Sequence, residues 1–335
     1  MAKTYTATQI LKLYRSDKSK STMLRDEKKS VIPPSQRVDR GATSVRVWSE
    51  PDLSRIGSVY GFLDKPISPK IISVYAPKGG VLKSTLTFNF ARTLALNGIN
   101  VLAIGLEVSQ RTLTNNLEIP VNYEDLEDAS RNKDIGLWEV SNGLCTLQEA
   151  ILKTNLPTLS YIPESSNLNL LEQKIKDSSR REYYLQRLLR PVLDKYDVII
   201  FDNSPSWGSF LVKNSLAMAT DIIAPFSCEL ESFRSVSESI QLVNDFEKEM
   251  ELNWNSFSVV PTKIDKTKLS KQIETQYRVL FDNMVTTSSI RYLKAAAEES
   301  SMLQQTVVET HNSSPLADDY YGVVPEIWKR MNKKG

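Results

Sequence analysis

The segment Val74–Ala91, VYAPKGGVLKSTLTFNFA, contains residues whose types and spacing suit phosphate binding. Its two glycines, Gly79 and Gly80, give the backbone the freedom to point successive N–H groups at an anion. Lys83 places a positive charge where a helix is expected to begin, and the hydroxyl of Ser84 can serve as a ligand for Mg²⁺. The pattern therefore predicts a loop that binds the phosphates of a nucleotide.

An aspartate at the end of an apolar run further along the chain is the expected partner of this loop. The run Tyr196–Asp202, YDVIIFD, ends in a carboxylate that can hold the magnesium ion through water. A glycine turn that is followed by a lysine for no functional reason is the alternative interpretation. The order of strand, loop, helix and aspartate-ending strand favours the nucleotide site.

Apolar strands that alternate with helical stretches must position these residues. A helix is expected from Ser84 to Gly98, where the glycine closes it. Strands that are apolar on both faces indicate an α/β fold, with a mostly parallel sheet and helices on both faces, as in P-loop NTPases. Ligands of such sheets bind at the carboxyl ends of the strands, where the loop, Asp202 and Thr262 fall. The expected strands are Lys70–Ala76, Asn100–Leu106, Tyr196–Asp202, Asp221–Phe226 and Ser256–Thr262.

The chain changes character near Pro66. The residues before it are rich in Lys, Arg and Ser, whereas the residues after it form the apolar runs described above. The segment DKPISPK, which contains two prolines, is typical of a linker. We therefore expect a small domain over residues 1–64, a linker over 65–70 and the nucleotide domain over 71–335.

Composition excludes several classes of site. The 335 residues include 42 Lys and Arg against 40 Asp and Glu, so any contact with nucleic acid depends on local basic patches. Cys145 and Cys228 lie far apart and His311 is the single histidine, which excludes disulfide frameworks, Cys/His metal sites and a serine–histidine triad. The sequence has no apolar run of bilayer-spanning length and no apolar leader, so we expect a cytoplasmic protein.

The loop segment KGGVLKST resembles the deviant Walker A motif of the ParA/MinD ATPases. The resemblance continues in YDVIIFDNSPSWG, VVPTKID and SSIRYLKAAAEES, and it covers most of the chain from Lys70 to Arg330. It implies ATP and Mg²⁺ as ligands and a dimer that closes around the nucleotide. In such a dimer Lys78 reaches the ATP of the partner subunit, while Lys83 serves its own.

The resemblance also implies a set of site residues. The switch region would be 202–206, the magnesium contacts would be Ser84 and Asp202, and the adenine contacts would be near Pro261, Thr262 and Asp265. The residues expected to take part in catalysis are Lys78, Lys83, Glu107 and Asp202. The loop residues expected to contact the nucleotide are Lys78, Gly79, Gly80, Val81, Leu82, Lys83, Ser84 and Thr85.

Three residues depart from the family pattern. Leu82 stands where the family has glycine, and a left-handed backbone there would cost about 1 kcal/mol or more. Gly105 replaces the first aspartate of the usual VDLDPQ segment, and Glu107 replaces the second, which positions the attacking water. The longer side chain of Glu107 misplaces its carboxylate by about 1 Å, which can slow chemistry roughly 100-fold. We therefore expect a slow ATPase that DNA or a partner stimulates.

The N-terminal residues form a second ordered pattern. A helix capped by Thr6, a second short helix before a proline pair, a basic two-stranded wing with a turn at Gly41 and a further helix are expected in that order. The pattern resembles the winged helix-turn-helix of MerR-type DNA-binding domains over about sixty residues. It implies base contacts from Ser21, Thr22 and Arg25. Lys18 and Lys20 lie at the start of that recognition helix, and the implied phosphate contacts in the wing are Arg37, Arg40 and Arg46. Trp48 is interpreted as a packing residue. A solvated basic arm or a dimerisation domain is the alternative.

Two features near the C-terminus bear on partners. Arg291 and Lys294 match the position of a non-specific DNA surface in the family, and a helix would place them on one face. The tail PEIWKRMNKKG has a short apolar stripe that could mimic a membrane helix. Trp328 is better interpreted as docking the last helix, so no membrane partner is expected.

These observations favour a DNA partition ATPase. It would dimerise on ATP, bind DNA on the nucleoid, segregate cargo with a ParB-like centromere-binding partner and repress its own operon. One alternative is a DNA-binding regulator whose nucleotide fold is a scaffold without hydrolysis, which Leu82, Gly105 and Glu107 would suit. The other is a MinD-like positioning ATPase.

Overall fold

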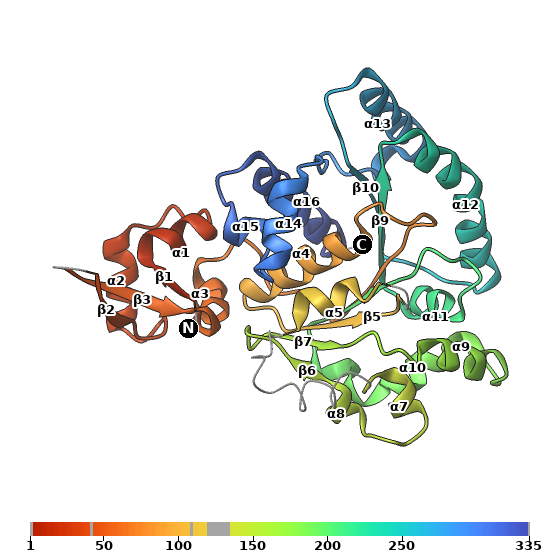
Figure 1. Cartoon of the computed structure of the whole chain (residues 1–335), viewed down its shortest axis with the longest axis horizontal. Coiled ribbons are helices and arrows are strands. Elements are labelled where there is room, and N and C mark those ends of the chain that lie inside the picture. Colours follow the sequence, from red (N-terminus) through yellow and green to blue (C-terminus); the bar gives the residue numbers. More distant parts are fainter. Residues whose placement is uncertain (1–2, 41–42, 108–109, 119–134, 334–335) are drawn as a thin grey trace.

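The chain is organised around two β-sheets. The computed structural model describes residues 3–40, 43–107, 110–118 and 135–333. A three-stranded sheet lies near the N-terminus, and a seven-stranded sheet forms the centre of the remaining chain. The two sheets lie in different parts of an elongated molecule (Figure 1). Among the described residues, none of the helices combines the length and hydropathy that a membrane-crossing segment needs.

The large sheet is mostly parallel, as the sequence predicts. Its order is β10-β9-β4-β8-β5-β7-β6, and only the edge pair β6–β7 is antiparallel. All five expected strands are present, because their continuous apolar runs are buried on both faces. The short strands β6 and β7 were not expected. The strands are β4 (Lys70–Val74), β5 (Val101–Gly105), β6 (Leu152–Lys153), β7 (Leu159–Ile162), β8 (Val198–Asp202), β9 (Asp221–Ser227) and β10 (Ser256–Thr262).

Helices cover both faces of this sheet (Figure 1). On one face the apolar core includes helix α4 (Lys83–Leu96), which follows the phosphate loop, together with α5 (Thr112–Leu117), α15 (Val307–Thr310) and α16 (Pro315–Met331). The other face packs against α7 (Leu137–Ser141), α9 (Leu168–Lys176), α10 (Tyr184–Leu189) and α11 (Phe210–Met218). The remaining helices are α8 (Leu147–Ala150), α12 (Leu230–Glu249), α13 (Lys268–Phe281) and α14 (Lys294–Met302), with short 3₁₀ turns η3 (Arg181–Tyr183), η4 (Arg190–Lys195) and η5 (Asp282–Met284).

The N-terminal module has its own small sheet. Strand β3 pairs with both β1 and β2, so the hairpin expected as a wing is extended by a third strand. Thr6 caps the first helix, and Trp48 is fully buried with its indole N–H donating to Pro33 O at 2.8 Å, which confirms its packing role. Gly41 lies outside the described residues. The elements are β1 (Thr4–Thr6), α1 (Ala7–Leu13), α2 (Lys20–Lys28), β2 (Gln36–Arg40), β3 (Thr43–Ser49), η1 (Glu50–Asp52) and α3 (Leu53–Tyr60).

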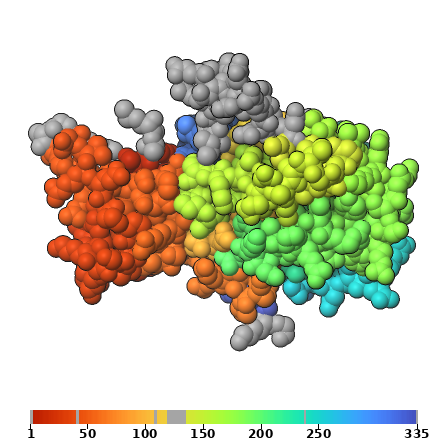
Figure 2. All heavy atoms as spheres, turned by 90° about the horizontal axis from the view of Figure 1, so that it is seen from below, coloured from red at the N-terminus to blue at the C-terminus, as the bar shows by residue number. Residues whose placement is uncertain are grey.

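The N-terminal module packs directly on the last turn of helix α4. The hydroxyl of Tyr14 donates to Leu96 O at 3.0 Å, and Asn97 Oδ1 accepts from the backbone N–H of Phe62 at 2.8 Å. One apolar core runs continuously from this module into the nucleotide domain. The module therefore forms one packed end of the molecule rather than an arm on a free linker (Figure 2).

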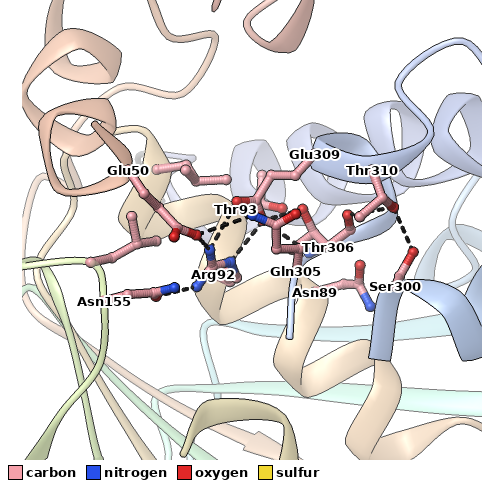
Figure 3. A network of polar contacts seen from close by, with 12 residues as sticks. Glu50, Asn89, Arg92, Thr93, Asn155, Ser300, Gln305, Thr306, Glu309 and Thr310 are labelled. Carbon is pink, nitrogen blue, oxygen red and sulfur yellow. Dashed lines mark hydrogen bonds and ion pairs between the residues drawn. The ribbon is translucent and has the colours of Figure 1, made fainter. Parts of the chain in front are cut away.

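A buried ion network joins the same two parts (Figure 3). Arg92 of helix α4 is 2% exposed and donates to Glu50 of the N-terminal module at 2.5 Å and to Glu309 of α15 at 2.7 Å. Its remaining nitrogen donates to Asn155 at 2.8 Å. Helix α4 therefore has its first residue at the phosphate loop and its last turns inside a contact with the N-terminal module.

The last helix is anchored in the core of the protein. Trp328 is 4% exposed and its indole N–H donates to Asp64 O at 2.8 Å. Ile327 and Met331 are also buried in the core. The apolar stripe of the tail is thus used for packing, as expected for Trp328.

Candidate nucleotide-binding site

The loop between β4 and α4 has the backbone that a phosphate cradle needs. Gly80 and Leu82 both adopt left-handed conformations, with φ of 72° and 70°. Alternation of this kind turns successive backbone groups toward one side of a loop. A Cβ at Gly79 or Gly80 would meet no described atom within 4 Å, so the loop borders open space. The left-handed backbone at Leu82 confirms that this departure from glycine is a strained one.

Two buried charges lie behind the loop. Lys83 opens helix α4 and is 6% exposed, and burial lowers the pKa of its ammonium group. Asp202 ends strand β8 and is fully buried; burial raises the pKa of its carboxyl to about 6, although Ser84 and Lys83 oppose the shift. Thr87 donates to Asp202 Oδ1 at 3.2 Å. The structure thus brings together Lys83, Ser84 and Asp202, as the sequence predicts.

The other residues expected in catalysis lie around this pair. Glu107 follows β5, is half-buried, and its charge acts on both Lys83 and Asp202. Lys78 instead donates to Glu231 Oε2 of helix α12 at 2.9 Å. That glutamate had no signal in the sequence, because its role depends on where α12 begins.

The residues expected near the adenine occupy the end of strand β10 and the loop after it. The hydroxyl of Thr262 donates to Val81 O at 3.0 Å, which ties this strand to the phosphate loop. Pro261 is buried beside it, whereas Asp265 is exposed and accepts from Thr267 at 2.8 Å. Thr262 therefore supports the loop directly, and Asp265 faces solvent.

A buried glutamate that the sequence analysis missed lies at the same sheet edge. Glu164 follows strand β7 and is fully buried, and burial together with the charge of Asp202 raises the pKa of its carboxyl to about 7. Its side chain fills the space beside Gly105, where a Cβ would lie only 2.3 Å from Glu164 Cγ. The one feature of the sequence that could have indicated Glu164 is Gly105, which has no side chain and so leaves room for a neighbouring one.

The site meets the requirements of a magnesium ion. Among the described residues, no group forms a hydrogen bond with Asp202 Oδ2 or Glu164 Oε1, although both atoms are buried. Mg²⁺ prefers oxygen ligands and keeps several waters. Two buried carboxylate oxygens without donors, one of them on Asp202 beside the hydroxyl of Ser84, are the chemistry that such an ion needs.

The residues expected to read bases lie on helix α2. Ser21 and Arg25 are exposed and four residues apart, so they share a face of the helix. Met23 is fully buried and holds the opposite face in the core. The N-cap residue Ser19 accepts from the N–H of Thr22 at 3.1 Å.

The two lysines at the start of this helix differ in environment. Lys20 is the first residue of α2 and is exposed. Lys18 donates to Val59 O at 3.1 Å and lies 4.2 Å from the centre of the Tyr60 ring. Lys18 therefore already has partners within its own module.

The wing arginines lie on the hairpin β2–β3. Arg37 and Arg46 are directly opposite each other, and Arg46 pairs with Glu27 at 2.5 Å. The backbone of Arg40 belongs to β2, and its side chain lies outside the described residues. The hairpin thus presents Arg37 as an exposed cation beside a neutralised Arg46.

The prediction that Arg291 and Lys294 share one face of a helix is wrong. Helix α14 begins at Lys294, so Arg291 lies in the preceding loop. Arg291 forms two side-chain hydrogen bonds with Asp319, both at 2.7 Å, and Lys294 pairs with Glu298 at 3.4 Å. The reason is that the segment before Lys294 pairs with Ile264 as an isolated bridge instead of continuing the helix.

Comparisons with known proteins agree with this geometry. The family model AAA_31, described as an AAA domain, matches residues 69–259. The cell division protein PomZ of Myxococcus xanthus is 28% identical over 255 residues, which are 76% of each chain. The chromosome-partitioning ATPase Soj of Treponema pallidum is 26% identical over 209 residues, 62% of this chain and 77% of that protein.

A solved structure shows the same fold. The plasmid partition protein of Borrelia burgdorferi bound to AMPPNP superposes with a TM-score of 0.60 at 21% identity, over 78% of this chain and 99% of that one. The family model covers more than half of the sequence. The chain belongs to the AAA_31 family and is a P-loop ATPase of the ParA/MinD type.

Proposed function

We propose that this chain is a DNA partition ATPase of the ParA type. It binds ATP with Mg²⁺, dimerises around the nucleotide, binds DNA and segregates cargo with a ParB-like partner on the nucleoid in the cytoplasm. The observation that supports the proposal best is the unsatisfied oxygen of the buried Asp202 beside Lys83 at the end of the phosphate loop. The names of the relatives and the AMPPNP bound to the Borrelia protein support it further.

Each residue of the nucleotide site has its own role in the proposed mechanism. Lys83 would neutralise phosphate charge, and Ser84 and Asp202 would hold the magnesium ion, Asp202 through water. When bound, that ion spreads and neutralises the negative charge of the phosphates. Glu107 orients the attacking water, and its extra methylene relative to aspartate makes hydrolysis slow. Loop residues 78–85 and residues Pro261, Thr262 and Asp265 complete the nucleotide contacts.

Lys78 is the proposed contact to the partner subunit. Its present partner Glu231 is 85% exposed, and an exposed ion pair of this kind contributes at most about 1 kcal/mol. The pair is therefore weak enough to exchange for the phosphates of a second subunit. This exchange would link nucleotide binding to dimerisation.

The N-terminal module is the proposed site-specific DNA reader. In this assignment residues 1–64 are a winged helix-turn-helix, 65–70 a linker and 71–335 the ATPase domain. Helix α2 carries the exposed face of Ser21 and Arg25, and the hairpin adds Arg37 for phosphates. The module would bind an operator and repress the operon that encodes the protein. Arg291 and Lys294 would contribute to non-specific DNA binding only after leaving their carboxylate partners.

Co-sedimentation on non-specific DNA tests the proposal. With ATP and Mg²⁺ the protein is expected to dimerise and to sediment with DNA, whereas with ADP or without nucleotide it is expected to remain free. Turnover of ATP is measured in the same samples, with and without DNA. DNA binding without any turnover would instead favour the scaffold regulator, and equal DNA binding in all three states would contradict the proposal.

A pair of arginine variants tests the operator-reading function. Arg25→Ala on helix α2 is expected to weaken operator binding by about 1–3 kcal/mol. Arg55→Ala is the matched control, because Arg55 is an exposed arginine of the same module on helix α3. Equal losses in both variants would argue against a recognition role for α2.

A further inference from the structure

Three adjacent strand ends place Asp202, Gly105 and Glu164 in a row. Gly105 is the register partner of Asp202 across β5 and β8, and Glu164 follows β7 on the other side of β5. The side chain of Glu164 lies over the glycine, where a Cβ at position 105 would be 2.3 Å from Cγ, 2.5 Å from Cδ and 2.9 Å from Oε1. Glu164 therefore uses space that any other residue at position 105 would occupy.

One oxygen of Glu164 is fixed and the other has no partner. Oε2 accepts from the N–H of Thr114 at 2.9 Å and from its hydroxyl at 2.7 Å, and the same hydroxyl accepts from the N–H of Glu164. Among the described residues, nothing donates to Oε1, although Glu164 is fully buried. The second carboxylate of the row, Asp202, likewise has one unpartnered oxygen.

We propose that Glu164 is a positioning residue of the nucleotide site: its free Oε1 and Asp202 Oδ2 together accept hydrogen bonds from the water shell of the Mg²⁺ that accompanies the nucleotide. The inference rests on the proposed binding of ATP with Mg²⁺. Gly105 stands where the sequence resemblance leads one to expect an aspartate. Glu164 thus supplies, from the segment that follows strand β7, the carboxylate that β5 lacks.

A purely structural role is the competing explanation. Oε2 of Glu164 accepts from Thr114 in the first turn of helix α5, and this contact alone could account for a glutamate at this position. Such a role requires one oxygen and no charge. The proposed role requires the second oxygen, and outer-shell partners of a metal typically change its affinity 10–100-fold when lost.

Magnesium-dependent nucleotide binding distinguishes these roles. The affinity for a fluorescent, non-hydrolysable ATP analogue is measured over a range of Mg²⁺ concentrations and in EDTA. Glu164→Gln keeps the shape and the acceptor for Thr114. We expect it to leave affinity in EDTA within about two-fold of wild type and to raise the Mg²⁺ concentration for half-maximal enhancement about ten-fold.

A second buried glutamate, Glu139, provides the control variant. Glu139→Gln alters another buried glutamate, whose two oxygens already accept from Gly136 at 2.8 Å and Asn167 at 2.7 Å, and it should bind magnesium and nucleotide like wild type. An unchanged Mg²⁺ requirement in Glu164→Gln would overturn the proposal but not the proposed function. A wild-type chain that binds no analogue would overturn both.

An exchange of the two positions provides a second, independent test. Glu164→Ala removes the three atoms that lie nearest to a Cβ at position 105, and Gly105 has no positive φ, so an aspartate there no longer meets the Glu164 carboxylate or backbone strain. We expect Glu164→Ala to lose the Mg²⁺ enhancement and the double variant Gly105→Asp/Glu164→Ala to recover most of it. Failure of the folded double variant to recover any enhancement would contradict the proposal.

Discussion

The two ends of helix α4 each bury a basic residue among carboxylates, and only one end is complete. Near the C-terminal end, Arg92 donates to Glu50, Glu309 and Asn155, so that its buried charge is fully paired (Figure 3). At the N-terminal end, Asp202 beside Lys83 and Glu164 beyond the neighbouring strand β5 each have one buried carboxylate oxygen without a donor among the described residues. The same helix therefore has a fully paired structural contact near one end and, near the other, a polar site with unpaired oxygens.

The difference indicates which cluster serves the fold and which serves a ligand. A buried charge costs several kcal/mol unless it is paired and hydrogen-bonded. The Arg92 network meets this condition with protein atoms alone, so its purpose is to dock the N-terminal module. The cluster beside the phosphate loop leaves one oxygen of each carboxylate unpaired, which a protein tolerates where a ligand completes the site.

Removal of the Arg92 side chain, near the fully paired end of helix α4, should have the largest effect on stability. Arg92→Ala leaves Glu50 and Glu309 as unpaired buried carboxylates and is expected to lower the free energy of unfolding by about 3–5 kcal/mol. Urea denaturation measures the change. Arg15→Ala is the control, because Arg15 also pairs across the module contact, with Asp318, but is 46% exposed. That variant should lose less than about 1 kcal/mol, and comparable losses in both would refute the distinction.

Filling the space beside Gly105 tests the packing of the incomplete end. Gly105→Asp alone forces the Glu164 side chain out of its position and is expected to cost about 1–3 kcal/mol through overpacking. The same substitution in a Glu164→Ala background should cost little relative to that background. Thermal unfolding of the four proteins gives the coupling, and additive effects would show that the two side chains do not compete for space.

Removing the charge of Glu164 should stabilise the nucleotide-free protein in EDTA. Burial and the charge of Asp202 raise the pKa of this carboxyl from 4.5 to about 7, so the folded chain holds the proton more tightly than the unfolded chain does. Its charge therefore lowers stability progressively as the pH rises from about 5 to about 7. Glu164→Gln should gain about 1 kcal/mol at pH 8 and almost nothing at pH 5. A gain that is the same at both pH values would contradict the assignment.

The smallest expected effect concerns Leu82. Its left-handed backbone, with φ of 70°, costs about 1 kcal/mol that glycine would not incur. Its partly buried side chain packs against the core, and Leu82→Gly loses that contact. The two terms oppose each other, so the free energy of unfolding should change by less than about 1 kcal/mol. A loss of several kcal/mol in chemical denaturation would show that packing outweighs backbone strain.

The sequence predicted those parts of the fold that depend on long apolar patterns. The apolar run of strand β8 is long enough to indicate a buried strand, and a glycine marks the end of helix α4. The loop residues Gly80 and Lys83 have the spacing that is characteristic of a phosphate loop. Strand β7 was missed because four residues between prolines do not establish a period. Glu164 was missed with it, since a single glutamate after an unrecognised strand has no motif.

Contacts between residues that are distant in the sequence could not be predicted from it. The pairing of Arg92 with Glu50 and Glu309 joins three segments that only the folded chain brings together. Arg291 was placed on a helix by its spacing from Lys294, but Asp319 holds it in the preceding loop. The spacing of residues predicts which of them could share a helix or strand. It does not predict which residues a tertiary contact will hold outside that helix or strand.

Isothermal titration calorimetry with ATP and Mg²⁺ tests the central claim most directly. If the incomplete cluster at the start of helix α4 is a nucleotide site, the wild-type protein gives a saturable heat of binding, and Lys83→Ala gives none under the same conditions. Arg92→Lys, at the complete end of the helix, should leave the affinity unchanged in the folded protein. No heat from the wild type at millimolar ATP and Mg²⁺, or equal heats from wild type and Lys83→Ala, would contradict the account.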